Sequence, residues 1–167
     1  ILKRFTAPKH LDRAFEIANE CDAMPSSYNM IGIPTEGREE VLDTLRLNAH
    51  LAPDVVKVMT FFPFNGTPLY NYCVAHDLID YEKKGQLDNY ESGTCLKFEP
   101  EHQLFLKKIQ KVFPLYLNVY SDMDPQGLCG RQIDDVMRMD EAEWNEFDCE
   151  AASAEIAAKM SETGQSF

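Results

Sequence analysis

The spacing of hydrophobic residues along the first 79 residues alternates between two periods. Apolar residues three and four positions apart predict amphipathic helices, the first of which opens with Thr6 as a cap and Pro8 in the first turn. Apolar runs rich in β-branched and aromatic residues predict strands between the helices. The predicted strands cover residues 28–33 and 55–62, and the later helices run from residue 35 to Pro53 and from residue 67 to about residue 76.

Strands that alternate with amphipathic helices favour parallel pairing through right-handed crossovers. Both predicted strands are mostly apolar, which is typical of a sheet that is covered on both faces. We therefore predict an α/β fold for residues 1–79.

The pattern changes after residue 79. Residues 80–99 have mixed charge and two glycines, which predict a long connection. The predicted features that follow are a helix from Pro100, a kink or end at Pro114, a loop over residues 121–130 and alanine-rich helix over residues 134–162. We predict that residues 80–167 form a mainly helical C-terminal extension.

The formal net charge of the 167-residue chain is −12. A surface this acidic repels phosphate backbones, so we expect no nucleic-acid binding through a basic face. No apolar run approaches the ~20 residues that a membrane-spanning helix needs, so we expect no membrane partner. Ten acidic residues lie within residues 134–162, against two basic ones, which predicts a solvated helical face. Binding of Mg²⁺ or of a basic partner is the alternative for that face.

The five cysteines lie at positions 21, 73, 95, 129 and 149, with a shortest gap of 20 residues. No CxxC or CxxxCxxC spacing occurs, so local cysteine spacing predicts no metal or cluster site. Reduced, buried cysteines are typical of a cytoplasmic protein, and we predict that location. Cys95 and Cys129 are candidate reactive thiols, although no neighbouring base is evident. The four histidines form no HxH or HExxH pattern and are assigned to the surface or to packing.

The segment MIGIPTEG, residues 30–37, is the first candidate site. Ligands of parallel α/β folds gather at the carboxyl ends of the strands, and this segment ends the first predicted strand. Gly32 permits close approach of a ligand to the backbone, and the N–H groups near residues 35–38 suit an anionic or polar group. Glu36 either accepts a hydrogen bond from a ligand or caps its own helix. An ordinary strand-to-helix turn explains the same residues, and the spacing alone favours that alternative.

Two segments resemble the barrel of radical S-adenosylmethionine (SAM) enzymes. The segment NMIGIPTE, from Asn29 to Glu36, resembles the N-x-I-G-L-P-G-E-T segment of that family's fifth strand. The segment FFPFNGTPLY, from Phe61 to Tyr70, is similar to the Y-P-Y-P-G-T-x-L-Y segment of its sixth strand. The spacing between the two segments and the ILKRFT opening of the chain also fit. The departures from the family lie in the turns, at Thr35, Gly37 and Asn65.

The resemblance implies a partial (βα) barrel with two or three parallel strands and flanking helices, followed by the helical extension. It also implies that residues at the ends of the two strands, and a basic residue after strand four, line a SAM pocket. The residues matched in this way are Ile31, Gly32, Glu36, Phe62, Pro63 and Arg4. Phe61, Phe62 and Phe64 are candidates for an adenine slot, although aromatic strand residues belong more often to the core.

The CxxxCxxC motif that binds the 4Fe–4S cluster in this family is absent. In the family it follows strand one, and this chain matches from the end of strand four, so we interpret the absence as truncation. The resemblance thus implies a C-terminal fragment of an iron–sulfur oxidoreductase that contributes part of the SAM pocket and is inactive alone. SAM and the cluster are expected in the full-length parent, with cobalamin as in the most similar members. None of them is expected to be held firmly by the fragment, and the substrate is unknown.

The alternative function requires no catalysis. A non-catalytic α/β interaction module with two parallel strands leaves open sheet edges, which predicts a homodimer through those edges. A third function, independent nucleotide binding, is weaker because the chain lacks a GxxxxGK[ST] or GxGxxG phosphate loop.

Overall fold

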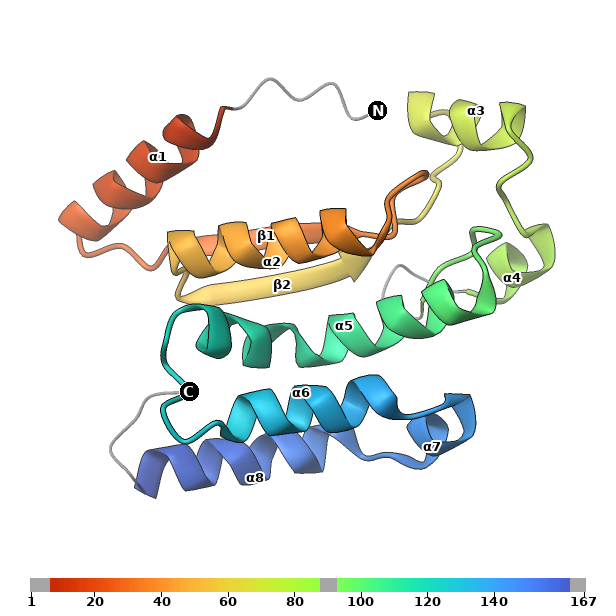
Figure 1. Ribbon diagram of the computed structural model, residues 1–167. Coiled ribbons are helices and arrows are strands. Elements are labelled where there is room, and N and C mark those ends of the chain that lie inside the picture. The colour runs from red at the N-terminus through yellow and green to blue at the C-terminus, as the bar shows by residue number, and fades with distance from the viewer. Residues whose placement is uncertain (1–6, 88–92, 163–167) are drawn as a thin grey trace.

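The computed structural model of the chain describes residues 7–87 and 93–162. In these residues the fold is mixed α/β and mostly helical, with eight helices and a two-stranded parallel sheet (Figure 1). The first elements are α1 (Pro8–Glu20), β1 (Ser26–Ile31), α2 (Arg38–Leu51), β2 (Val55–Thr60) and α3 (Pro68–Ala75). The later helices are α4 (Tyr81–Gln86), α5 (Pro100–Tyr120), α6 (Leu128–Arg138), α7 (Glu141–Glu146) and α8 (Cys149–Glu162). The predicted α/β class and the predicted element order of the first region are confirmed.

The two strands pair in parallel, with Ser26 opposite Val55 and Ile31 opposite Thr60. Helix α2 connects them and lies against one face of the sheet (Figure 1). Its buried residues Val41 and Leu45 belong to the same hydrophobic cluster as Ile31. Parallel pairing through a helical connection is thus as the alternation of elements predicts.

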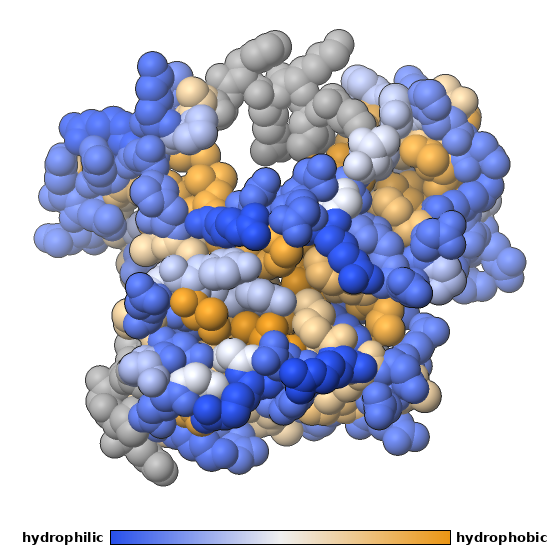
Figure 2. Space-filling model, in the orientation of Figure 1, coloured by the Kyte–Doolittle hydropathy of each residue, from blue (hydrophilic) through white to orange (hydrophobic). Residues whose placement is uncertain are grey.

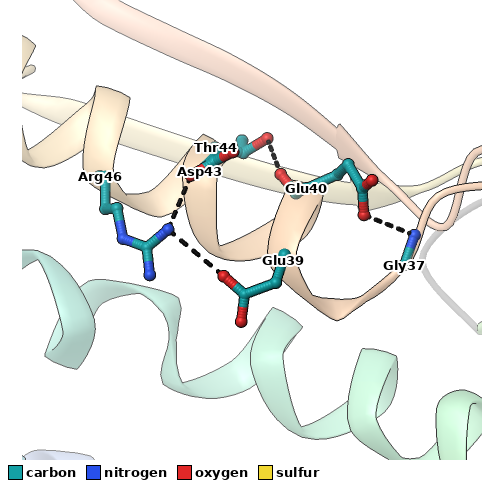
Figure 3. A network of polar contacts seen from close by, with 6 residues as sticks. All are labelled: Gly37, Glu39, Glu40, Asp43, Thr44 and Arg46. Atoms are coloured by element: carbon teal, nitrogen blue, oxygen red, sulfur yellow. Dashed lines mark hydrogen bonds and ion pairs between the residues drawn. The ribbon is translucent and has the colours of Figure 1, made fainter.

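The boundaries at MIGIPTEG differ from the prediction. Strand β1 ends two residues early because the backbone turns at Gly32, whose φ of 71° is left-handed and suits glycine. Thr35 also has a positive φ, 72°, so it cannot belong to a right-handed helix, and α2 begins at Arg38. Gly37 is the N-cap residue of α2, and its N–H donates to the Glu40 carboxylate at 3.0 Å (Figure 3).

A buried amide holds α2 to the sheet. Asn48 is 2% exposed, and its Oδ1 accepts hydrogen bonds from Ser27 Oγ at 2.6 Å and from Asn29 Nδ2 at 3.1 Å. Its Nδ2 donates in return to Asn29 Oδ1 at 2.8 Å. A polar group that is buried with its partners satisfied fixes the helix to one register on β1.

The exposed side of α2 carries ion pairs instead. Arg46 lies 2.7 Å from Asp43 and 3.6 Å from Glu39 on this side (Figure 3). Because solvent screens exposed pairs of this kind, they contribute little to stability. The buried side of α2 therefore decides its position.

Among residues 7–87 and 93–162 no helix covers the second face of the sheet, and its side chains are exposed, so the prediction that both faces are covered is wrong for this part of the chain. Side chains alternate along a strand, and Ile31 and Asn29 point toward α2 while Tyr28 and Met30 point away from it. Tyr28 is 68% exposed and Met30 is 42% exposed. The apolar run predicts a strand that is buried on both sides, whereas the strand in the structure starts at Ser26 and alternates in burial.

Helix α5 belongs to two hydrophobic clusters. Phe105, Leu106, Ile109 and Phe113 pack with residues of β1, β2 and α2. Val112 and Leu115 pack with buried residues of α6 and α8. Figure 1 shows α5 between the sheet unit and the α6–α8 pair. The division between residues 1–79 and 80–167 stays a prediction, and α5 packs across it.

Helix α5 also covers the outer edge of β2. Gln110 Nε2 donates to the backbone oxygen of Val58 at 3.2 Å, and Thr60 Oγ1 lies 3.5 Å from Gln110 Oε1. A side-chain amide thus occupies the place where a third strand would pair. Of the two sheet edges that the sequence predicts to be open, this one is covered.

The extension contains more helix than the sequence predicts. Residues 80–99 include α4, whose N-cap Asp80 accepts from the N–H groups of Glu82 and Lys83. Helix α5 continues through Pro114 to Tyr120 rather than ending there. Pro114 lies on the exposed side of α5, so its ring does not enter the packing of the buried side.

Lys108 joins α5 to the end of α6. It is 3% exposed, and its ammonium group donates to the backbone oxygens of Met137 and Met139. The carbonyl groups at a helix C-terminus lack intrahelical partners and carry partial negative charge, so they suit a buried cation. Burial lowers the pKa of Lys108, an effect that Glu143 and Asp140 oppose.

Candidate functional site

The carboxyl ends of β1 and β2 lie side by side. Phe61 N–H donates to the Ile31 carbonyl at 2.8 Å, which extends the ladder one residue beyond β2. The predicted site residues Ile31 and Gly32 therefore lie next to Phe61, the residue that precedes the predicted site residues Phe62 and Pro63. Ile31, Gly32 and Pro63 are buried, whereas Phe62 is half-buried.

Gly32 is approached closely, but by the chain itself. A Cβ atom at Gly32 would lie 3.0 Å from Leu106 Cδ1 and 3.4 Å from Thr60 Cγ2. The sequence predicts that a ligand comes close to this glycine, and in the structure Leu106 of α5 occupies that space. The glycine is needed for its left-handed φ and for this helix contact.

Glu36 folds back onto the end of β1. Its Oε2 accepts hydrogen bonds from Gly32 N–H at 2.5 Å and from Ile33 N–H at 3.3 Å. Glu36 does not cap α2, because its carboxylate caps the turn before the helix, and its contact with a ligand stays a prediction. Burial raises the pKa of Glu36, the two backbone hydrogen bonds oppose the rise, and Glu40 adds to it.

The imidazole of His102 lies beside Glu36, although the sequence pattern does not indicate a role for this histidine. The imidazole contacts the backbone of Glu36 and lies with its centroid 4.8 Å from the Phe98 ring and 5.8 Å from the Phe105 ring. Its Nε2 is buried and finds no hydrogen-bond partner in the described part of the chain. Burial, and then the positive charge of Arg38, lowers the pKa of His102 and favours the neutral ring. No motif surrounds this histidine, so only the fold of α5 against residue 36 reveals it.

The three phenylalanines after β2 have different environments. Phe61 is 5% exposed and packs with Cys73, Ile79 and Leu96, as the core alternative predicts. Phe62 is half-buried and Phe64 is exposed, and their ring centroids lie 5.1 Å apart. A continuous adenine slot from all three rings is therefore not present in this structure.

A groove opens beside Thr60, between α4 and α5. Its volume is about 170 Å³, and its lining includes Lys83, Gln103 and Leu106. Ligand pockets typically measure roughly 300–1,000 Å³. None of the residues matched to the SAM pocket lines this groove. Arg4, the remaining matched residue, lies outside the described residues.

The candidate thiols are buried. Cys95 and Cys129 are each 0% exposed, and burial raises the pKa of both, that of Cys129 to about 11. At neutral pH both side chains are neutral thiols, which are poor nucleophiles. Within residues 7–87 and 93–162, no three His, Cys, Asp or Glu side chains are arranged to hold a metal ion.

Comparison of the chain with protein-family models, with curated proteins and with solved structures finds no significant match. None of the helices in the described residues is both long enough and apolar enough to cross a bilayer. The cytoplasmic location stays a prediction.

Replacement of Glu36 tests the turn that joins β1 to α2. A raised pKa means that folding favours the protonated acid, so Glu36 contributes stability below its ordinary pKa of 4.5 that is lost as pH rises through the folded-state value. We expect the wild type to lose stability relative to Glu36→Gln between acid and neutral pH. Urea unfolding of both proteins across this range measures the difference.

Glu36→Ala is the matched variant, because it removes the acceptor altogether. It leaves the buried Gly32 N–H unpaired and should cost about 1–3 kcal/mol relative to Glu36→Gln at neutral pH. Equal stability of the Gln and Ala variants would show that the carboxylate does not hold the turn. A wild type that gains stability relative to Gln as pH rises would contradict the raised pKa.

Proposed function

We propose that the chain is the C-terminal part of a radical SAM-type barrel and that it supplies part of the SAM pocket of a full-length iron–sulfur enzyme. The observation that carries the proposal is the adjacency of the two strand ends, at Gly32 and at Phe62. The two segments that resemble the family lie 24 residues apart in sequence, between Glu36 and Phe61, and the parallel register places their strands side by side. In a barrel, such neighbouring strand ends line one ligand site.

The described residues fit this role in part. Phe62 offers a half-buried ring beside the buried backbone of Pro63, which suits an adenine contact. Glu36 holds the Gly32 and Ile33 N–H groups in place and thereby fixes the end of β1. Leu106 fills the space against Gly32, so a ligand there requires displacement of the N-terminal half of α5. We therefore assign no reaction step to these residues.

The barrel itself also belongs to this proposal. Two parallel strands with one covered face and one open face are what a segment of a barrel wall presents, since the open face would line the barrel interior. Tyr28 and Met30 on the open face then pack against strands supplied from elsewhere in the parent. The cluster, SAM and cobalamin are bound by the complete parent under this proposal, and its substrate is unassigned.

The gene upstream of Ile1 provides the first test. We expect it to encode a CxxxCxxC motif roughly a hundred or more residues before Ile1, the distance set by the size of the missing barrel units. The full-length protein, reconstituted with iron and sulfide and then reduced, should cleave SAM to 5′-deoxyadenosine, whereas the isolated chain should bind SAM weakly or not at all. An upstream region without the motif would overturn the proposal.

In the full-length protein, Phe62→Ala should raise the KM for SAM about five- to tenfold, because a stacking ring is lost. Val74→Ala is the matched control, since Val74 is a 45% exposed apolar residue on α3. Equal KM values for the two variants would remove Phe62 from the pocket.

A second candidate function, a non-catalytic module that forms a homodimer, is favoured by the free edge of β1. Because Ile31 C=O bonds to β2, the backbone groups of Tyr28 and Met30 face the opposite edge. Within the described residues these groups have no strand partner, since the sheet order is β1–β2. The same two residues present exposed apolar side chains, so one surface offers both backbone pairing and apolar contact.

Tyr28→Lys tests this second function, because a lysine blunts an edge strand by its charge. If β1 forms the dimer, light scattering coupled to size exclusion should show a dimer for the wild type and a monomer for Tyr28→Lys. Val74→Lys introduces the same charge on α3, at another exposed apolar residue, and should remain dimeric. A monomeric wild type, or equal loss of dimer in both variants, would reject the β1 interface.

A further inference from the structure

The ammonium group of Lys84 lies in an aromatic corner at the start of the extension. Lys84 Nζ is 5.5 Å from the ring centroid of Phe62 and 5.3 Å from that of Tyr70. It also donates a hydrogen bond of 2.9 Å to Asn65 Oδ1. Phe64 packs on Phe62 with a centroid distance of 5.1 Å and extends the aromatic surface. Three elements therefore meet at one cation: the loop after β2, α3 and α4.

The groups that surround the cation have a distinctive chemistry. The described side chains in contact with Lys84 Nζ are two ring faces and an amide oxygen, all of them neutral. The chain has a net charge of −12 and offers 28 carboxylates, so a lysine has many anionic partners available. Ring faces attract a cation through their quadrupole, and this attraction is strongest when the cation holds little water.

A primary ammonium is strongly hydrated, so it is a poor match for this corner. A methylated ammonium has no or fewer N–H groups and spreads its charge over methyl surfaces, which pack on aromatic faces. Recognition of quaternary ammonium groups by aromatic residues is the usual functional use of such geometry. The corner is open to ligands, because Phe64 is 54% exposed and Phe62, Tyr70 and Lys84 are half-buried.

We propose that Phe62, Phe64, Asn65 and Tyr70 form a binding site for a small quaternary ammonium ligand, which Lys84 occupies as an internal competitor. The ligand's methyl groups contact the rings of Phe62 and Tyr70, and its charge replaces that of Lys84. Lys84 then swings into solvent on the short helix α4. The proposal does not depend on the barrel or on SAM, although Phe62 is common to both.

Titration of the full 167-residue chain with tetramethylammonium chloride tests the site. The readout is the NMR shift of the Phe62 and Tyr70 ring resonances. Lys84→Ala should bind the probe about tenfold more tightly than the wild type, because the internal competitor is gone. Lys84→Arg keeps a cation on the same helix and should bind as weakly as the wild type.

Two further titrations test whether binding depends on the methyl groups of the probe and on the two aromatic rings. Ammonium chloride at the same ionic strength should bind Lys84→Ala more weakly than tetramethylammonium does. Addition of Phe62→Leu and Tyr70→Leu to Lys84→Ala should abolish binding. Binding to Lys84→Ala that is no tighter than to Lys84→Arg, or binding that survives loss of both rings, would overturn the proposal.

A measurement on the wild-type fold guards against misfolded variants. Reductive methylation converts the lysines to dimethylammonium groups, and the methyl resonance of Lys84 should shift upfield relative to the other lysines, because it lies over two rings. A Lys84 methyl resonance at the position of the exposed lysines would also overturn the proposal.

Discussion

The structure depends on the burial of α5 on two sides. Phe105, Leu106, Ile109 and Phe113 complete the core under β1, α2 and β2, and Val112 and Leu115 complete the core with α6 and α8. Two parallel strands and one helix bury too little apolar surface to be stable alone. Because α5 supplies residues to both clusters, these two cores share one helix, whereas the smaller cluster of Phe61, Cys73, Ile79 and Leu96 contains no residue of α5.

The same helix determines which surfaces of the sheet remain available. Leu106 closes the space against Gly32, and Gln110 bonds to the outer edge of β2. The open face with Tyr28 and Met30 and the free edge of β1 remain. Figure 2, which views the molecule from the α2 side, shows a mainly hydrophilic surface with hydrophobic residues in the grooves between helices. Residues of α5 thus cover the face that bears Ile31 and the outer edge of β2. The other face and the outer edge of β1 have no packing or pairing partner among the described helices and strands.

The fold class follows from the sequence because hydrophobic periodicity and caps are local. Thr67 and Pro68 predict the start of α3, where Thr67 Oγ1 accepts from Tyr70 N–H at 3.1 Å, and Glu99 and Pro100 predict that of α5. The contacts of MIGIPTEG are not local. Thr35 takes a left-handed φ that its residue type disfavours, Leu106 comes from 74 positions beyond Gly32, and His102 carries no motif. The role of Asn48, a polar residue on the buried side of α2, does not follow from the local sequence because its partners lie on another element.

Native-state hydrogen exchange of the isolated chain tests the central role of α5 most directly. If α5 joins the two cores, the amides of β1, β2 and the buried part of α5 should exchange through one common opening, with the free energy of global unfolding. Independent exchange of the sheet amides, at a markedly lower free energy than those of α5, would contradict this account. It would show that the sheet unit opens while α5 stays folded on α6 and α8.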